Sequence, residues 1–346
     1  MKKKEKQHYA SIIDIANRLK ISAATVSRVL NNYPYVKEDT RKKVLELVEE
    51  MGFQKNGIAS SLRSRKTYCI GLIVPRISMV FHSSIITVIQ NELYERGYNL
   101  MICQSNDSAD IESKLLDTFI AARVDAVIIA ATLTTVEIKS LQKLTESNIP
   151  VVFYDRVPKG IEKALVVRGD DFQGGYLAGS HLAEVGCKNI AVIMGLLSSN
   201  IYEDRLNGFR EALRQHNLKI KPEWMFLQEL TVENARSALY KIFSSKSIPD
   251  GLFAANDTTA ITTVEFLKER NIAVPGQVKV MGYSNDPRTS IITPAITTIE
   301  QMPERFGVSI VNELMSVLDK KEAKHGIKNG QSPVIIPVQL IRRMST

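Results

Sequence analysis

Cysteine is scarce in this chain, and long apolar runs are missing. The 346 residues include three cysteines, Cys69, Cys103 and Cys187, which are far apart and form no Cys-x-x-Cys pair. This pattern argues against a disulfide framework and a cysteine-rich metal site. No apolar run approaches the roughly 20 residues that a membrane-spanning helix needs, and no secretory signal follows the basic start. We therefore expect a cytoplasmic protein with no membrane partner.

The common catalytic and cofactor motifs are also missing. The chain contains no Gly-x-Gly-x-x-Gly after its first predicted strand, no phosphate-binding P-loop, no His-Glu-x-x-His and no Gly-x-Ser-x-Gly. Its five histidines are scattered. The sequence therefore predicts neither an enzyme nor a metal or cofactor site.

Positive charge is unevenly distributed along the chain. The formal net charge is +8, and residues 1–66 account for all of it, with 15 Lys and Arg against 7 Asp and Glu. A small basic module on a larger neutral body is typical of a protein whose head binds a polyanion such as DNA. The alternative, a solubilising basic tail, does not explain the helical pattern within the segment.

Residues 11–52 carry the pattern of three short helices. Ser11 can cap a first helix whose apolar residues recur at helical spacing, and a tight turn follows. Ser22 can cap a second helix over AATVSRVLN, and a third helix is predicted from Glu38 to Met51. Two helices joined by a short turn and completed by a third form a helix-turn-helix.

The outward face of the second helix carries small side chains and one arginine. Ala24, Ser27, Arg28 and Asn31 point away from the apolar face, with Thr25 beside them. Small residues let a helix enter the major groove of DNA, and Arg28 can donate two hydrogen bonds to guanine. The polar neighbours can bind phosphates or base edges. The alternative is a helical bundle with a solvated polar face, which does not explain why the positive charge is confined to this segment.

Residues 53–66, FQKNGIASSLRSRK, allow two interpretations. Ile58, Ala59 and Leu62 suffice for one marginal helix, too short to be stable alone in water. If it folded on docking, Leu62 would be an apolar wedge for the minor groove, and the basic residues around it, Arg63 among them, would hold phosphates. On the pattern alone, a plain interdomain linker is favoured.

The rest of the chain alternates short apolar runs with amphipathic stretches. Eight runs have the character of buried strands: 69–74, 98–103, 126–130, 151–154, 164–167, 190–194, 252–255 and 278–282. The stretches with helical character lie around 83–96, 109–122, 135–147, 174–186, 203–216, 232–244 and 258–270. This alternation predicts an α/β fold of parallel sheets covered on both faces, and the number of strands fits two lobes better than one sheet. The GGYLAG segment at 174–179 predicts close packing of a helix against a strand.

Polar side chains follow several of the predicted strands. They are Asp155-Arg156, Asp170-Asp171, Asn256-Asp257, Ser284-Asn285 and, at the start of a helix, Arg205. Ligands in such folds bind at the carboxyl ends of strands or in the cleft between lobes. Carboxylates and amides can hold vicinal hydroxyls, and an arginine can clamp a carboxylate or a hydroxyl. Each residue could instead cap a helix or lie in a surface loop, but their convergence on one side of the sheets favours a ligand site.

These features together resemble the LacI family of bacterial transcriptional regulators. IIDIANRLKISAATVSRVLNN resembles the DNA-binding helices of the family, and the similarity continues through residues 37–78 and through DFQGGYLAGSHLAEVG, DRLNGFREAL, DGLFAANDTTA and VPGQVKVMGYSND. It implies a helix-turn-helix domain (residues 1–54), a hinge helix or linker (55–67) and a two-lobed periplasmic-binding-protein-like core (68–346) with three crossovers. It also implies a homodimer, a pseudo-palindromic double-stranded DNA operator and a small sugar-like effector that controls a repressor allosterically.

Position by position, the resemblance assigns two sets of site residues. Together with Arg63 of the wedge interpretation, the residues that would contact or support DNA are Ala23, Ala24, Thr25, Ser27, Arg28, Asn31, Tyr35, Thr40, Asn56, Ala59 and Leu62. The residues that would contact the effector are Ser78, Met79, Phe81, Arg156, Asp170, Arg205, Asn256, Asp257 and Ser284. The assignment of the hinge residues reverses the preference for a plain linker.

Two departures from the family pattern bear on function. Ser60 stands where the family often has arginine, which predicts a lower affinity of the hinge for DNA. Ser284 replaces an aspartate that often binds ligand hydroxyls, so the sequence does not identify the effector. A sugar-binding transport protein and a sugar-acting enzyme are the alternatives. The basic head argues against the first, and the missing catalytic motifs argue against the second.

Overall fold

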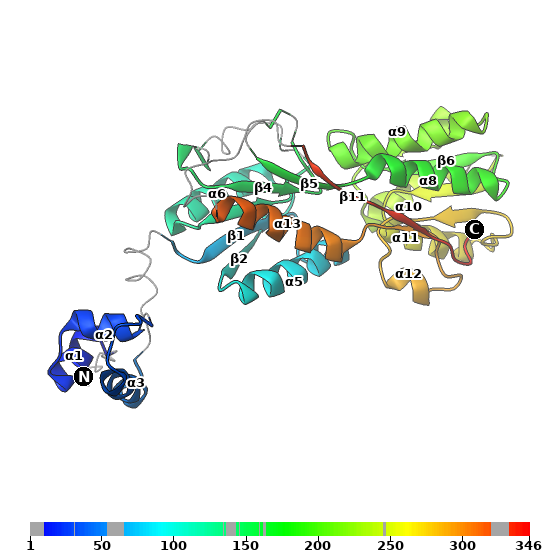
Figure 1. Ribbon diagram of the computed structural model, residues 1–346. Coiled ribbons are helices and arrows are strands. Elements are labelled where there is room, and N and C mark those ends of the chain that lie inside the picture. The colour runs from blue at the N-terminus through cyan, green and yellow to red at the C-terminus, as the bar shows by residue number, and fades with distance from the viewer. Residues whose placement is uncertain are drawn as a thin grey trace, which may run out of the picture. The chain divides into compact units, whose positions relative to one another are not determined.

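The computed structural model describes residues 10–30, 32–53, 66–133, 135, 143–144, 146–158, 160–161, 164–244, 247–319 and 332–346. The chain divides into two compact units, residues 1–67 and residues 68–346 (Figure 1). Five residues predicted to contact DNA lie outside the described residues: Asn31, Asn56, Ala59, Leu62 and Arg63.

The described part of the first unit is built on α1 (Ile12–Leu19), α2 (Ala23–Leu30) and α3 (Glu38–Glu50). Ser11 forms a capping box with Asp14 at the start of α1. The Ser22 hydroxyl accepts a hydrogen bond from the Thr25 N–H at 3.1 Å at the start of α2. The helices share one apolar core, which consists of Ile15, Ala16, Val26, Val29, Val44 and Leu47. The predicted caps and the predicted helix-turn-helix are confirmed.

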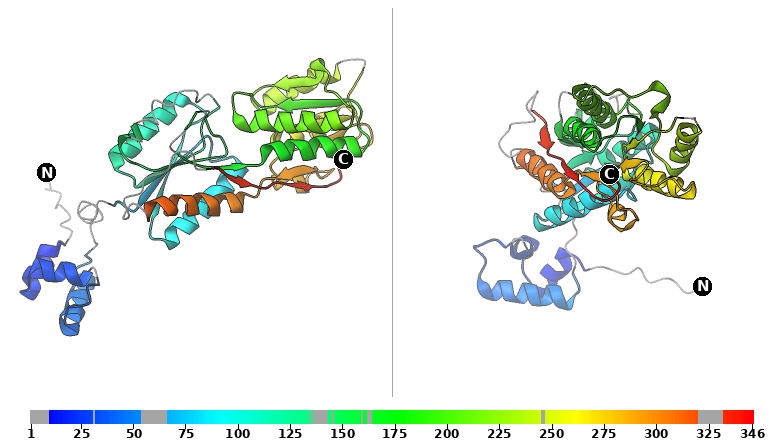
Figure 2. Two further views of the ribbon diagram at one scale, coloured as in Figure 1. Left: turned by 45° about the horizontal axis from the view of Figure 1, so that its top comes forward. Right: turned by 90° about the vertical axis from the view of Figure 1, so that its right-hand side faces the viewer.

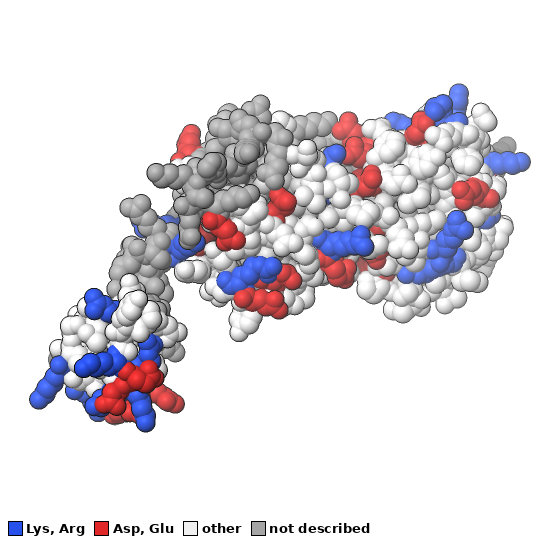
Figure 3. Space-filling view, viewed as in Figure 1, with Lys and Arg blue, Asp and Glu red and all other residues white. Residues whose placement is uncertain are grey.

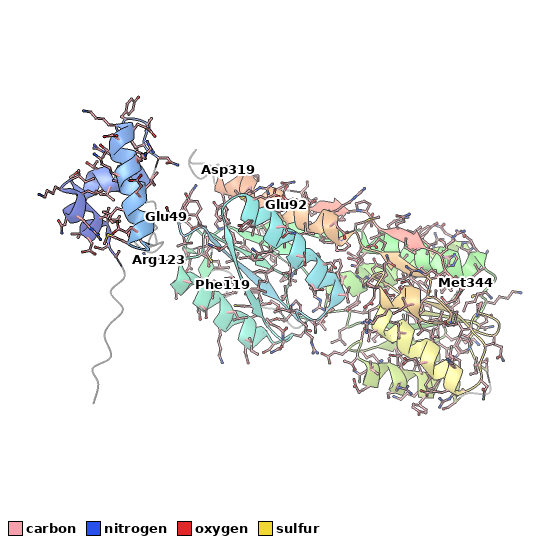
Figure 4. All side chains as sticks on the ribbon, turned by 90° about the horizontal axis from the view of Figure 1, so that it is seen from below. Glu49, Glu92, Phe119, Arg123, Asp319 and Met344 are labelled. Carbon is pink, nitrogen blue, oxygen red and sulfur yellow. The ribbon has the colours of Figure 1, made fainter. Side chains whose placement is uncertain are left out.

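The first lobe of the second unit is a parallel sheet with helices on both faces (Figure 2). The strand order is β11-β5-β4-β3-β1-β2. The strands are β1 (Cys69–Val74), β2 (Asn99–Gln104), β3 (Ala126–Ile129), β4 (Val151–Tyr154), β5 (Leu165–Gly169) and β11 (Val334–Ile336). α5 (Val80–Glu95) and α13 (Pro303–Leu318) cover one face. α6 (Ala109–Ala122) covers the other face with the buried ring of Phe119 (Figure 4).

The second lobe repeats this arrangement with a four-stranded parallel sheet in the order β7-β6-β8-β9. Its strands are β6 (Ile190–Met194), β7 (Met225–Leu227), β8 (Gly251–Ala254) and β9 (Lys279–Met281). α8 (Asp171–Glu184) and α9 (Asn200–Gln215) cover one face. α10 (Val232–Phe243) and α11 (Asp257–Glu269) cover the other. A short helix, α12 (Arg288–Ile291), follows β9.

The chain crosses between the lobes three times. β5 leads into α8, the segment after β10 (Thr298–Glu300) leads back into α13, and β11 leads into β12 (Gln339–Ile341). β10 and β12 pair as an antiparallel ribbon beside the second lobe. The predicted α/β class and two-lobed core are confirmed. Four strands of three residues each were not predicted: β7, β10, β11 and β12.

The GGYLAG segment brings two helices together. An added Cβ at Gly175 of α8 would lie 1.9 Å from the carbonyl oxygen of Arg205 in α9. A Cβ at Gly208 of α9 would lie equally close, 1.9 Å from the carbonyl oxygen of Phe172. The sequence predicted that this segment packs against a strand. Ala178 of the segment does pack in the core over the sheet, while its glycines let two helix backbones touch.

We expect Gly175→Ala to lower the free energy of unfolding by at least about 1–3 kcal/mol, because the added methyl group forces α8 and α9 apart. Urea denaturation measures the change. Gly276→Ala is the matched control, since its Cβ meets only the Cβ of Ala273 at 3.4 Å. Equal stability of the two variants would contradict the backbone contact.

Candidate functional site

One candidate site is the outward side of α2 in the first unit. Ala23, Ala24 and Arg28 are exposed, whereas Thr25 and Ser27 are half-buried. The Thr25 hydroxyl lies 2.8 Å from the Ser22 hydroxyl, so the helix cap orients it. The result is a shallow helical surface of small side chains from which one guanidinium extends.

Among the described helices of the first unit, α3 carries most of the acidic residues together with three basic residues at 41–43, whereas α2 carries Arg28 and no acidic residue. Basic and acidic side chains both appear on its visible face (Figure 3). The acidic residues of α3 are Glu38, Asp39, Glu46, Glu49 and Glu50. Since carboxylates repel phosphates, the absence of acidic residues from α2 favours its approach to a nucleic acid. Of the two remaining predicted residues, Tyr35 is 91% exposed, and Thr40 is half-buried in the first turn of α3.

The second candidate site is a cleft of about 380 Å³ between the two lobes of the second unit. Seven of the nine predicted effector residues line it: Ser78, Met79, Phe81, Arg156, Asn256, Asp257 and Ser284. The first lobe contributes the segment between β1 and α5 together with Arg156, which follows β4. The second lobe contributes the start of α11 and the segment after β9. The ends of parallel strands thus bring together residues that are far apart in the sequence.

Five of the seven charged residues that line the cleft are ion-paired with one another. In the first lobe, Asp107 accepts a hydrogen bond of 2.5 Å from Nη1 of Arg156, and Nε of Arg76 lies 3.7 Å from the same carboxylate. In the second lobe, Arg288 donates two side-chain hydrogen bonds to Asp286, at 2.9 and 2.6 Å. Nε of buried Arg156 has no hydrogen-bond acceptor within the described chain. The cleft therefore offers both donors and acceptors, with most of its charge already neutralised.

Asp257 is the buried carboxylate of the second wall. It accepts hydrogen bonds from the Asp286 N–H and the Thr298 hydroxyl, both at 2.7 Å. Burial raises the pKa of Asp257 to about 6, and these two hydrogen bonds oppose the rise. Neighbouring Asn256 caps α11 through the Thr259 N–H at 2.9 Å. Both residues thus shape the wall as well as lining it.

A raised pKa at Asp257 makes its contribution to stability depend on pH. The folded protein holds the proton more tightly than the unfolded chain, so this contribution is full below the unfolded value and is lost as pH rises from about 4 through about 6. We expect Asp257→Asn, measured against the natural chain, to gain about 1–3 kcal/mol between pH 4.5 and pH 7.5. Urea denaturation at both pH values tests this. Asp117→Asn on α6 is the control, and a pH-independent difference for Asp257→Asn would contradict the prediction.

The segment from Ser284 to Asp286 forms part of the same wall in an unusual backbone conformation. Ser284 has φ 118° and Asn285 has φ 51°. The Ser284 hydroxyl donates to Gln301 Oε1 at 2.7 Å, and Asn285 Oδ1 accepts from Nη2 of Arg343 at 2.6 Å. Side chains from distant parts of the chain therefore hold the segment in place.

The other two predicted effector residues do not line this cleft. Asp170 caps α8 by accepting a hydrogen bond from the Gln173 N–H at 3.0 Å. Arg205 is buried, and its Nε donates to Oδ1 of Asp171 at 2.7 Å. Burial lowers the pKa of Arg205, but the carboxylate of Asp171 more than offsets this and keeps the guanidinium charged. The role of Asp170 is helix capping, one of the alternatives that the sequence left open, whereas the buried ion pair of Arg205 was not among those alternatives.

Sequence reasoning missed several residues of the cleft. They are Arg76, Asp107, Leu133, Tyr202, Glu229, Leu230, Thr231, Thr258, Asp286 and Arg288. Two of them could have been predicted from their place in the sequence, because Asp286 continues the polar segment at 284–285 and Asp107 follows the second predicted strand. Glu229 to Thr231 follow β7, and without that strand nothing marked them.

Two features are absent from the described residues. Within the described ranges, no helix is long and apolar enough to cross a membrane. The same part of the chain has no group of three or more His, Cys, Asp or Glu side chains arranged to hold a metal ion.

Two family models together match most of the chain. The model described as bacterial regulatory proteins, lacI family, matches residues 11–56. The model described as periplasmic binding proteins and sugar binding domain of LacI family matches residues 67–343.

Curated relatives match along nearly their whole length. The HTH-type transcriptional repressor PurR of Actinobacillus pleuropneumoniae serotype 3 is 30% identical over 306 residues, which cover 88% of this chain and 90% of the relative. The protein of the same name from Histophilus somni is 29% identical over 318 residues, which cover 92% and 95%.

Solved structures share the fold. The Lac repressor dimer bound to operator and the anti-inducer ONPF has a TM-score of 0.85 at 22% identity, covering 98% of this chain and 99% of that one. The complex of the transcriptional regulator CelR with cellobiose has a TM-score of 0.72 at 24% identity, covering 97% and 100%. A periplasmic binding protein/LacI transcriptional regulator from Alkaliphilus metalliredigens, complexed with D-xylulofuranose, has a TM-score of 0.69 at 26% identity, covering 81% and 99%.

Proposed function

This chain belongs to the LacI family of bacterial regulatory proteins and is a sequence-specific DNA-binding transcriptional regulator, and we propose that it is a repressor whose operator affinity depends on a small sugar-like effector in the cleft. In this proposal residues 1–54 read DNA, residues 55–67 form the hinge, and residues 68–346 bind the effector and dimerise. The observation that carries it is a cleft with walls from two lobes in a chain whose net positive charge lies entirely in residues 1–66. No step requires catalysis, and we assign no enzymatic activity.

The chemistry of the cleft favours a neutral ligand rich in hydroxyl groups. A hydroxyl both donates and accepts hydrogen bonds, so it can satisfy the unpaired Nε of Arg156 and the carboxylate of Asp257 with one kind of group. Cellobiose and D-xylulofuranose, the ligands named for two structural relatives, have this character. Paired charges such as Arg288 with Asp286 offer little net attraction to an ion.

The effector controls DNA affinity only if it binds two states of the protein unequally. A ligand that contacts both walls of the cleft favours one relative orientation of the two lobes. We propose that this orientation sets the distance between the two hinges of a homodimer. That distance in turn determines whether the hinge helices form on DNA or melt. A two-fold dimer predicts an operator with inverted half-sites, with Leu62 of both copies at its centre. Such a regulator works in the cytoplasm, where the DNA is.

Arg28 is the one long hydrogen-bond donor among the predicted base-reading residues of α2. We expect Arg28→Ala to weaken binding to the preferred operator about tenfold to a hundredfold and to relax specificity at one base pair, since a bidentate contact to guanine is worth about 1–3 kcal/mol. Binding to a library of operator variants measures both effects. Lys43→Ala on α3 is the control for losing one positive charge. A uniform loss on all sequences would make Arg28 a phosphate contact instead.

The decisive experiment for the proposal is a screen of sugars by thermal shift, followed by operator binding with and without each hit. A ligand at a hundred times its Kd adds about 2.7 kcal/mol of stability. We expect a hit to change operator affinity, and Ser78→Trp, which fills the cleft from its exposed rim, to abolish both effects. Ligands that stabilise the protein without changing operator affinity would refute allosteric control.

A further inference from the structure

A second cavity lies at the opposite end of α9 from the cleft. The last turns of α9, the connection that follows it and the start of β7 line an open cavity of about 580 Å³. Its lining residues are Arg210, Leu213, Arg214, Asn217, Leu218, Lys219, Ile220, Pro222 and Met225. None of them lines the cleft. The volume falls in the range of about 300–1,000 Å³ that small-molecule sites occupy.

The floor of this cavity is apolar. Leu213 is buried at 1% exposure, and Leu218, Ile220 and Met225 are half-buried against the core of the second lobe. Leu218, Ile220 and Met225 therefore leave part of their apolar surface exposed to the cavity. An apolar chain or ring placed here would remove that surface from water.

The rim of the cavity is cationic and contains no carboxylate. Arg214 is neutralised, because it donates hydrogen bonds of 2.8 and 2.7 Å to Glu211. Arg210 instead donates to the sulfur of Met225 at 3.4 Å, although a thioether is a weak acceptor. Lys219 is exposed on the connection after α9. Two cations therefore face an apolar cavity whose lining holds no anion for them.

Helix stabilisation explains only part of this arrangement. Cations near the C-terminus of a helix interact favourably with its dipole, which accounts for basic residues in the last turns of α9. It does not account for an apolar cavity beside them or for a guanidinium placed on a thioether. A ligand that combines an anionic group with an apolar body would satisfy both features.

We propose that this cavity is a second ligand site, which takes a small amphipathic anion: a carboxylate, sulfonate or phosphate on an apolar chain or ring. The anionic group would pair with Arg210 and Lys219, and the apolar part would cover Leu213, Leu218 and Ile220. Tyr202 at the start of α9 lines the cleft, and Leu213 near the end of α9 lines the second cavity. The separation of 11 residues between these two positions spans about 16 Å along the helix. One helix therefore joins the two sites, and the proposal stands independently of which effector the cleft binds.

The test uses octanoate as the probe and the methyl signal of Met225 as the readout. The full chain is labelled with 13C at its methionine methyl groups, and Met225→Leu identifies the signal. We expect octanoate to shift this signal saturably and neutral 1-octanol to bind at least tenfold more weakly. Equal binding of the alcohol, or a shift that does not saturate, would overturn the proposal.

Matched variants locate the site. Arg210→Ala with Lys219→Ala should weaken octanoate at least tenfold, whereas the equally charged change Lys241→Ala with Lys268→Ala on other helices should leave it unchanged. If the first pair unfolds, Lys219→Ala alone should still weaken binding. Ser78→Trp, which blocks the cleft, should leave octanoate binding intact, and loss of octanoate in that variant would assign the probe to the cleft and refute a second site.

Discussion

Replacing Arg205 with methionine is expected to lower the free energy of unfolding by about 3–5 kcal/mol, because it leaves a buried carboxylate without its cation. Nε of Arg205 lies 2.7 Å from Oδ1 of Asp171, and Nη1 donates to the carbonyl of Ala255 at 2.9 Å. The guanidinium also lies 3.6 Å from the centre of the Tyr283 ring, whose hydroxyl donates to the same carboxylate at 3.1 Å. One substitution therefore disrupts a buried network. Urea denaturation of the full chain measures the loss.

The pH dependence of this loss identifies its cause. Burial already raises the pKa of Asp171, and Arg205 opposes the rise. Without the arginine the pKa rises further, so the folded variant binds a proton that the unfolded chain releases. Its stability must then fall as pH increases, and the defect should be smaller at pH 5 than at pH 7.5. The double variant Arg205→Met with Asp171→Leu should recover most of the loss. A defect that is equal at both pH values would point to lost packing instead of an unpaired charge.

Residues 68–346 on their own are expected to bind the operator at least a thousandfold more weakly than the full chain, which is the lower end of the usual gap between specific and nonspecific binding. All of the net positive charge and all of the proposed base contacts lie in the part removed. Fluorescence anisotropy with labelled operator measures the loss.

Two controls separate lost recognition from a damaged protein. The shortened protein should keep the thermal shift produced by the effector, because the cleft lies wholly within residues 68–346. Operator binding by the full chain should fall steeply with salt, by about 0.9 in the log–log slope for each phosphate neutralised. Operator affinity retained by the shortened protein would refute the assignment of DNA binding to the first unit.

The local sequence was sufficient to predict those helices and strands whose own residues mark where they lie. Ser11 and Ser22 marked two helices because a capping hydroxyl acts within three residues. The longer strands were visible because buried parallel strands are apolar on both faces. α13 and four three-residue strands, β7, β10, β11 and β12, were not visible, whereas the three-residue strand β9 lies within the apolar run predicted at 278–282.

Residues of the cleft could be predicted where they directly follow a strand that the sequence reveals. Asp257 and Arg156 followed recognisable strands, and both line the cleft. The position of Arg205 could not be read locally, because its partner Asp171 is 34 residues away and comes from a different helix. The opposing wall at Glu229 depends on β7, which is too short to recognise.

The order of elements in the first lobe has a consequence during protein synthesis. α13 and β11 complete this lobe, yet they are made only after the four-stranded sheet of the second lobe and its helices. About 150 residues separate the end of β5 from the end of α13, so at about 5–20 residues per second the ribosome needs about 10–30 s to supply the missing helix. Throughout this interval the sheet lacks the cover of Ile310, Val311 and Leu314. The nascent first lobe is therefore a natural client for chaperones, and rapid overproduction should send the protein into aggregates through this uncovered face before the cleft is complete.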